Sequence, residues 1–122
     1  LPPEVRSMIR RRQMEASRKR MMSAIPTADV VVTNPTHFSV ALRYDTTRGD
    51  APEVVAKGKG IVALRIRELA REHGVPVVAD PPLARGLYAS VELNQLIPEE
   101  FFAAVAAVLA FVYRTAARRA AA

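Results

Sequence analysis

One short segment of the chain, Asn34-Pro35-Thr36-His37, carries residue types that can cut a peptide backbone. Asparagine normally deamidates when the next backbone nitrogen attacks its side chain, but proline has no N–H and closes that route. The Asn34 side-chain nitrogen can instead attack its own backbone carbonyl carbon. This reaction closes a succinimide ring, releases Pro35 as a free secondary amine and cuts the chain between the two residues.

Such a cyclisation needs a fold that holds the asparagine amide over the carbonyl carbon. Backbone N–H donors would stabilise the developing oxyanion, and a proton must leave the amide and reach the departing proline nitrogen. His37 is the nearest titratable candidate for that proton transfer, two residues past the leaving group. Asn-Pro is also a common turn dipeptide, so these residues alone leave an ordinary hairpin turn open.

Two strands are predicted on either side of this segment. The β-branched run 29–33 is short and continuous, which indicates a central strand covered on both faces. From Phe38 to Tyr44 apolar and polar residues alternate, which predicts a second, half-buried strand. If the alternation extends back into the turn, His37 lies on the polar face and should be accessible.

Further elements follow along the chain, and the strands and helices alternate. Their pattern predicts an α/β fold with a small mixed four-stranded sheet, about four flanking helices and a protruding basic N-terminal helix. The expected elements are a polar loop at 45–52, a short edge strand at 53–57, a helix at 59–73 capped by Gly74, a buried strand at 76–79, a helical turn at 81–88 and a last helix from Pro98.

Apolar spacing predicts which faces of the two longer helices point inward. The longest apolar run, from Phe101 to Tyr113, is shorter than the roughly 20 residues that span a membrane, which favours a buried helix. In the helix predicted at 59–73, the inward residues are Val62, Ile66 and Leu69, widened by Ile61 and Leu64. In the last helix, they are Phe101, Val105, Val108 and Val112, with Phe102, Leu109 and Tyr113 beside them.

The net charge of +6 is concentrated at the beginning of the chain. Residues 1–23 hold seven basic and two acidic residues, and their helix has little to bury. A cytoplasmic segment next to an anionic membrane explains this charge, whereas nucleic-acid binding is disfavoured because the segment has no aromatic residue, and a solvated connector stays open. The predicted membrane-proximal residues are Arg10, Arg11, Arg12, Arg18, Lys19 and Arg20.

Other classes of site find little support in the composition. The chain has no cysteine and two histidines, so no disulfide, metal site or cofactor is predicted, and a reducing compartment such as the cytoplasm is favoured. A small hydrolase with His37 as its base would lack a partnered nucleophile. The segment 57–60 precedes a helix but lacks the complete phosphate-loop motif. A partner-binding patch and core packing are both open for Pro81, Pro82, Leu83 and Leu87.

The segment 28–42, which contains Asn34-Pro35-Thr36-His37, resembles the cytoplasmic domain of the bacterial type III export switch proteins. Asn-Pro-Thr-His is that family's self-cleavage signature. The sequence of residues 33–44 favours the flagellar branch of the family over the injectisome branch. The resemblance covers roughly residues 4–114. Segments 54–58, 63–68 and 81–85 carry it further.

The resemblance implies a role for each motif residue. Asn34 would cyclise, Pro35 would become a new N-terminus, and Thr36 and His37 would complete the motif, in a single-turnover reaction rather than enzymatic catalysis. Three segments are expected: a basic juxtamembrane linker helix at 1–25, the self-cleaving domain at 26–114 and, outside the resemblance, a disordered tail at 115–122. Because the chain opens on Leu1 rather than Met, it is expected to be a fragment of a longer protein. The resemblance implies that membrane-spanning helices precede it.

The resemblance also implies a biological role. The cut would permit a switch of export from rod and hook proteins to filament proteins, with the cleaved C-terminal fragment still associated. The implied partners are export-gate components, a length-sensing hook ruler protein and export substrates, but no nucleic acid. An uncleaved scaffold of the export gate and a basic nucleic-acid-binding module are the alternative functions.

Overall fold

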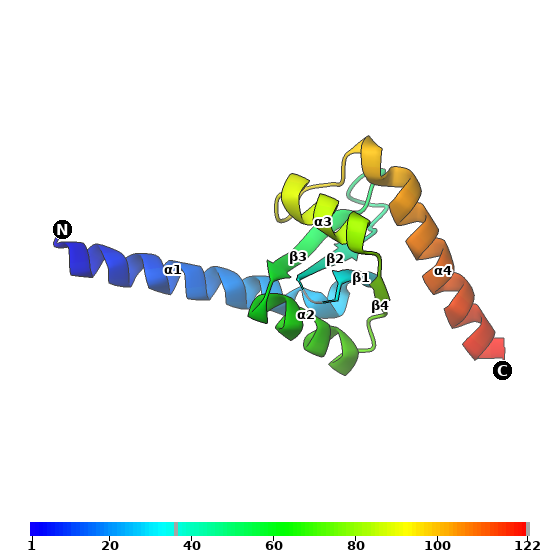
Figure 1. Cartoon of the computed structure of the whole chain (residues 1–122), viewed down its shortest axis with the longest axis horizontal. Coiled ribbons are helices and arrows are strands. Elements are labelled where there is room, and N and C mark those ends of the chain that lie inside the picture. The colour runs from blue at the N-terminus through cyan, green and yellow to red at the C-terminus, as the bar shows by residue number, and fades with distance from the viewer. Residues whose placement is uncertain (36, 122) are drawn as a thin grey trace.

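The computed structural model describes residues 1–35 and 37–121, and its centre is a mixed four-stranded sheet (Figure 1). The strand order is β3-β2-β1-β4; β1 pairs antiparallel with β2 and parallel with β4, and β2 pairs antiparallel with β3. In chain order the elements are α1 (Pro3–Ser23), η1 (Ile25–Thr27), β1 (Val30–Asn34), β2 (Phe38–Arg43), β3 (Glu53–Lys59), α2 (Ile61–Glu72), β4 (Val77–Ala79), α3 (Pro81–Ser90), η2 (Glu99–Phe101) and α4 (Phe102–Ala121).

The sheet confirms the predicted mixed topology and the central position of the first strand. All five residues of β1 are buried, as the continuous β-branched run predicts. The expectation of a half-buried second strand is wrong, because β2 is covered on both faces. Burial of the Ser39 hydroxyl is tolerated because it donates a hydrogen bond to the Ala63 carbonyl at 2.9 Å, and Ala41 is small enough to lie beneath α2.

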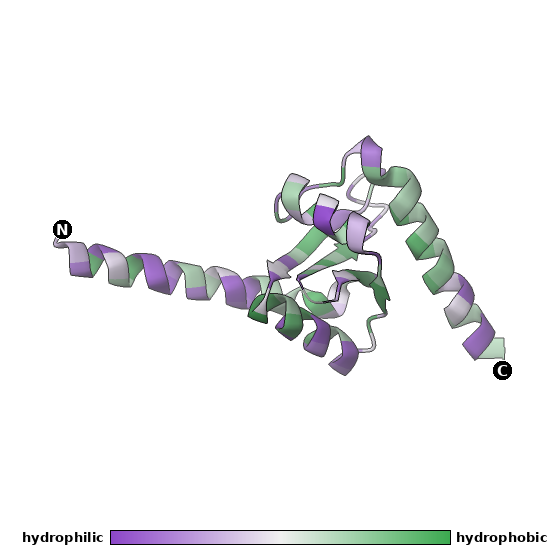
Figure 2. Ribbon diagram, viewed as in Figure 1, coloured by the Kyte–Doolittle hydropathy of each residue, from purple (hydrophilic) through white to green (hydrophobic). Residues whose placement is uncertain are grey.

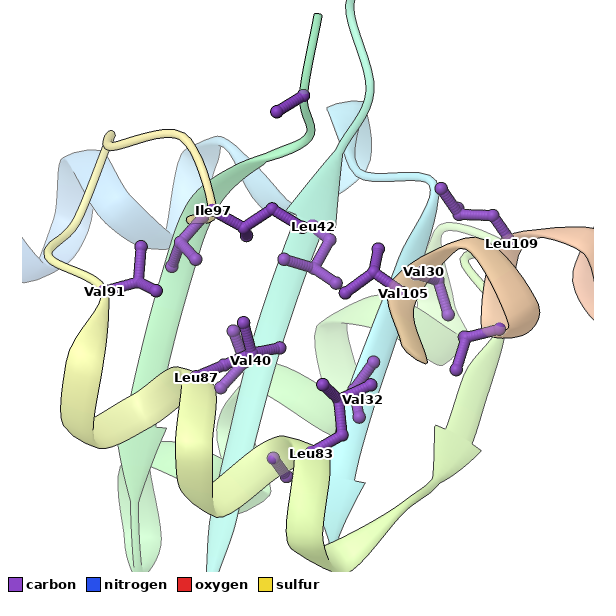
Figure 3. Packing of buried hydrophobic residues seen from close by; sticks show 14 of the residues in the cluster. Val30, Val32, Val40, Leu42, Leu83, Leu87, Val91, Ile97, Val105 and Leu109 are labelled. Carbon is purple, nitrogen blue, oxygen red and sulfur yellow. The ribbon is translucent and has the colours of Figure 1, made fainter. Parts of the chain in front are cut away.

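Two hydrophobic clusters lie on the two faces of the sheet. One packs Val30, Val32 and Val40 against residues of α3 and α4, and Figure 3 shows these side chains meeting between the strands and the two helices. The other packs Val31 and Ala41 against α2 and η1. Alternate residues of β1 therefore enter different clusters, which fixes the register of this central strand.

The inward face of α2 agrees with the predicted apolar stripe at Val62, Ile66 and Leu69 and differs at its two flanking residues. The residues that α2 buries are Ala63, Ile66 and Ala70, whereas Ile61 is 86% exposed and Leu64 is 45% exposed. Val62 and Leu69 are partly buried and pack against the cluster, as predicted. Small side chains let the helix lie close to β3, which leaves Ile61 and Leu64 at the exposed margin of this face. The predicted cap is confirmed, since Gly74 follows the helix with φ of +71°.

This close approach has its tightest point at Gly58 of β3. A Cβ atom added there would lie 2.3 Å from Val62 Cγ1 and 2.9 Å from Val62 Cβ. We expect Gly58→Ala to lower the free energy of unfolding by about 1–3 kcal/mol through overpacking, measured by urea denaturation. Adding Val62→Ala should recover part of this loss; no recovery would show that the Val62 contact is not the cause.

The last helices cover the other face of the sheet. In α4 the buried residues are Val105, Val108, Leu109 and Val112, whereas the predicted inward neighbours Phe102 and Tyr113 are exposed. The predicted disordered tail from residue 115 is not what the structure has, because α4 continues through alanine and arginine, both strong helix formers, to Ala121. By length and composition alone, 99–121 is the one helix in the described part of the chain able to cross a membrane.

The N-terminal helix α1 extends away from the sheet, as expected for the protruding basic helix (Figure 1). It buries no residue, and hydrophilic residues lie along most of its length (Figure 2). Only its C-terminal end reaches the domain, where Met21 and Met22 pack against the cluster beneath α2. The six predicted membrane-proximal cations, Arg10, Arg11, Arg12, Arg18, Lys19 and Arg20, are all exposed.

Candidate functional site

Asn34 is the last residue of the central strand, and it lies at the boundary between the core and solvent. It is paired with Phe38 across the β1–β2 hairpin and is 9% exposed, whereas Pro35 is exposed. The peptide bond between them therefore joins a residue held by the sheet to one that faces water. Thr36, the third residue of the predicted motif, lies outside the residues that the structure describes.

The carbonyl oxygen of Asn34 accepts a hydrogen bond from the His37 backbone N–H at 2.9 Å. This bond closes a tight turn with Pro35 at its second position, which suits the fixed φ of proline. The same oxygen would gain negative charge if the Asn34 side chain attacked the carbonyl carbon. The His37 N–H thus already donates to the oxygen atom that would need an oxyanion donor.

The His37 backbone is itself held from the next strand. The Gly60 N–H donates a hydrogen bond to the His37 carbonyl at 3.0 Å, directly after β3. Gly60 has a φ of +60°, a left-handed conformation that favours glycine. The N–H and the carbonyl of His37, on the two sides of its Cα, are therefore both hydrogen-bonded, which limits rotation of this residue.

The residue before Asn34 is held from the other neighbouring strand. The Asp80 N–H donates to the Thr33 carbonyl at 2.9 Å, and the Asp80 carboxylate caps α3 by accepting from the Leu83 N–H at 3.3 Å. Asp80 thus links the end of β1 to the start of α3. With β2 on one side and Asp80 on the other, the backbone on the N-terminal side of the Asn34–Pro35 bond has little freedom.

An aromatic pair supports the far side of the turn. The rings of Phe38 and Tyr88 lie 4.6 Å apart between centroids, and Lys57 Nζ lies 5.2 Å from the Tyr88 ring centroid. The same ammonium donates to the Tyr88 and Val91 carbonyls at 3.0 and 2.9 Å, at the end of α3. The Lys57 ammonium therefore caps that helix. It is not available to bind a phosphate, as the phosphate-binding interpretation of 57–60 would need.

The His37 side chain is exposed, as predicted, and beside it lies an open hollow of about 430 Å³ lined by His37, Phe38, Lys59 and Gly60. The ring of His37 meets that of Phe38 edge to face, with centroids 6.2 Å apart. An exposed imidazole next to the turn can exchange protons with water. The structure thus separates two contributions of His37: a fixed backbone donor and a free side chain.

The candidate partner-binding residues do not form a surface. Leu83 is 5% exposed and Leu87 is fully buried in the cluster between the sheet and α3, so core packing, the other interpretation, is correct for both. Their burial follows from their spacing by four on the inner face of α3. Of the four residues, Pro82 is exposed and Pro81 is half-buried.

Sequence reasoning missed three groups at this site because each acts through its backbone. These are the His37 N–H, the Gly60 N–H and the Asp80 N–H. Two weak signals were available: a glycine between a strand and a helix, and an aspartate directly before Pro81 in the position of an N-cap. Neither signal specifies which carbonyl is bound.

Comparison with known proteins identifies the family of this chain. The chain belongs to the FlhB HrpN YscU SpaS Family, which matches residues 2–112. It is 55% identical over 112 residues to the flagellar biosynthetic protein FlhB of Salmonella typhimurium, covering 92% of this chain and 29% of that protein. The chain therefore spans about a third or less of the length of such curated relatives.

Solved structures agree with this assignment. The cytoplasmic domain of FlhB from Shewanella putrefaciens matches with a TM-score of 0.82 and 47% identity, over 85% of this chain and 80% of that one. A C-terminal domain of EscU with an asparagine replaced by alanine matches with a TM-score of 0.72 and 36% identity, over 75% and 92%. A second EscU structure carries alanine in place of the next residue, a proline.

Proposed function

We propose that this chain is the self-cleaving cytoplasmic part of a bacterial flagellar type III export apparatus and that it cuts itself between Asn34 and Pro35. The observation that supports the cut most directly is the 2.9 Å hydrogen bond from the His37 N–H to the Asn34 carbonyl. Two similar EscU domains carry alanine in place of an asparagine and of the proline that follows it, so an Asn-Pro dipeptide has been substituted in those proteins as well.

The proposed reaction needs no group from outside the chain except water. The Asn34 side-chain nitrogen forms a bond to the Asn34 carbonyl carbon and loses a proton, while the bond from that carbon to the Pro35 nitrogen breaks. The departing nitrogen takes up a proton and becomes a secondary amine. His37 is proposed to carry protons between amide, water and leaving group. The products are a fragment that ends in a succinimide at Asn34 and one that begins at Pro35.

The proposed role of the cut is to switch export from rod and hook proteins to filament proteins. Because each molecule loses its own peptide bond once, the event is a single-use switch and not enzymatic turnover. The proposed partners are export-gate components, a length-sensing hook ruler protein and the export substrates. The whole protein would be embedded in the inner membrane, with the cations of α1 next to its anionic lipids.

The cut is proposed to change the turn without changing the core. Asn34 is held by strand pairing and burial, whereas Pro35 and His37 are exposed, so the freed Pro35 end can move while β1 stays in place. The surface that partners meet next to His37 would then differ between the uncut and the cut protein.

We expect the two halves to remain together until the domain unfolds. β1 forms five residue pairs with β2 and three with β4, so loss of the 1–34 fragment would remove the central strand and expose both clusters. The purified chain should elute as one species in native gel filtration. Intact-mass measurement in denaturant should then give one fragment ending at Asn34 and one beginning at Pro35.

The opposite result is equally clear. A single 13.4 kDa mass that persists after incubation at neutral pH and denaturation would contradict self-cleavage and support an uncleaved scaffold of the export gate. Fragments that separate without denaturant would contradict the argument that the sheet holds them together.

A further inference from the structure

The two edges of the sheet differ in how well they are protected. The beginning of β3 is covered by the segment 94–97: the Asn94 N–H donates to the Val54 carbonyl at 2.7 Å, and the Val54 N–H donates to the Gln95 carbonyl at 3.0 Å. At the opposite edge, β1 is the one strand among the described residues with which β4 pairs. Open edges are ready templates for an added strand, and most proteins cover or interrupt them.

The backbone groups that β4 leaves open follow from its hydrogen bonds to β1. The Pro76 carbonyl accepts from the Val31 N–H at 2.8 Å, and the Asp80 N–H donates to the Thr33 carbonyl at 2.9 Å. Residues 76, 78 and 80 therefore turn their backbone groups toward β1. Because these directions alternate along a strand, Val77 and Ala79 turn their N–H and C=O groups to the open side.

This open edge borders a groove rather than flat solvent. A groove of about 430 Å³ lies between the residues at the start of β4 and the C-terminal half of α4. Its β4 side includes Val75, Val77 and Val78, and its α4 side includes Val112 and Phe111, which is 53% exposed. Figure 1 shows β4 beside α4, and Figure 2 shows hydrophobic residues on both elements.

The charge around the groove has one sign. Arg71 and Arg119 line it, and within the described ranges 1–35 and 37–121 neither arginine forms a salt bridge. From Phe101 onward the chain has three arginines and no acidic residue. An occupant with a carboxylate at one end would complement these cations, whereas a second copy would bring the same basic helix against them.

We infer that the open edge of β4 binds an extended segment of a partner protein, which adds a strand to the sheet. Such a segment would pair with the Val77 and Ala79 backbone, place alternate apolar side chains against Phe111 and Val112, and direct an acidic residue to Arg71 and Arg119. Strand addition takes its affinity from backbone bonds and its selectivity from alternate side chains. This surface goes beyond the proposed cut and does not depend on it.

The test uses synthetic peptides with alternating valine and threonine and a pair of glutamates at one end or the other. On binding, amide hydrogen exchange at Val77 and Ala79 should slow by about tenfold or more, while the Val78 amide, already bonded to β1, should change little. Unchanged exchange at Val77 and Ala79 with every peptide would overturn the inference. Slowed exchange that depends on protein concentration without peptide would do the same, because the occupant would be a second copy.

Charge reversal supplies the matched control. Arg119→Glu should weaken binding of the glutamate peptide by roughly fivefold or more and improve binding of the same peptide with lysines in place of the glutamates. Arg118→Glu makes the same change one residue away, outside the groove lining, and should leave both affinities close to wild type. Equal effects of the two variants would show that only the general charge of α4 matters and would overturn the proposed site.

Discussion

Asn34→Ala should abolish the cut, because alanine has no side-chain nitrogen to attack the carbonyl carbon. The turn should survive, since the bond from the His37 N–H to the residue 34 carbonyl and the pairing with Phe38 are backbone features. After incubation at neutral pH for the time in which wild type is fully cut, denaturing mass spectrometry of the variant should show one uncut chain. Of all single changes, this one has the largest expected effect on the reaction.

The chain offers a matched pair of asparagines for the control. Asn34 and Asn94 are its two asparagines, and Asn94 lies in a loop with φ of +67°. Asn34→Asp keeps the shape of the side chain but replaces the attacking nitrogen, so it should also prevent the cut at neutral pH. Asn94→Asp makes the same change elsewhere and should cut like wild type. Normal cutting of Asn34→Asp would rule out the amide as the nucleophile.

Pro35→Ala tests why the pair is Asn-Pro. The alanine N–H opens the deamidation route that proline closes, so the Asn34 side chain should partly convert to aspartate or isoaspartate with the backbone intact. The cut should therefore become slower or incomplete. A variant that cuts as completely as wild type without deamidation would show that proline matters only for the shape of the turn.

The sequence predicted the strands around the turn because their signals are local. A β-branched run and a period-two alternation are properties of consecutive residues, and an Asn-Pro step between them marks the turn. The burial of Ser39 was not predictable, because it depends on the carbonyl of Ala63, 24 residues away. The hydrogen-bond partner of the Asn34 carbonyl was not predictable either, because it is a backbone N–H, which every residue except proline would supply.

Helix faces were harder to predict than helix positions. Counting large apolar residues placed Ile61 and Leu64 inward, but the distance between α2 and the sheet is set by Gly58, Ala63 and Ala70. Small residues at a close contact carry little hydrophobic signal, and large residues beside them stay partly exposed. A pattern based on residue size therefore identifies the helix and the centre of its inward face, but it misplaces residues at the margin of that face.

The charge pairing around Glu53 was also missed. Glu53 begins the predicted edge strand, and in the structure it is 2% exposed and bonded to Arg43 and Arg48, with Arg43 Nε at 3.1 Å and Arg48 Nη1 at 2.9 Å. A buried carboxylate needs such partners. The two arginines come from the strand before the polar loop and from the loop itself, so Glu53 holds that loop against the sheet. Only the fold brings the three side chains together.

The second large effect is expected at His37, where two variants separate the side chain from the backbone. His37→Ala keeps the N–H that donates to the Asn34 carbonyl and removes the imidazole, so the cut should slow by about 10²-fold or more through loss of proton transfer. His37→Pro removes the N–H as well and should slow the cut by roughly a further 10²–10³-fold, the usual cost of an oxyanion donor. Fragment formation followed by denaturing mass spectrometry gives both rates.

Added imidazole distinguishes chemistry from a structural effect. Because the His37 side chain is exposed beside an open hollow, free imidazole should reach the turn and accelerate cutting by His37→Ala. It should not rescue His37→Pro, which lacks the backbone donor, and thermal unfolding should show that this variant is still folded. His73→Ala changes the chain's other histidine and should cut normally. If His37→Ala cut at the wild-type rate, the imidazole would not be needed for the reaction. If imidazole rescued His37→Pro, the His37 backbone N–H would not be needed.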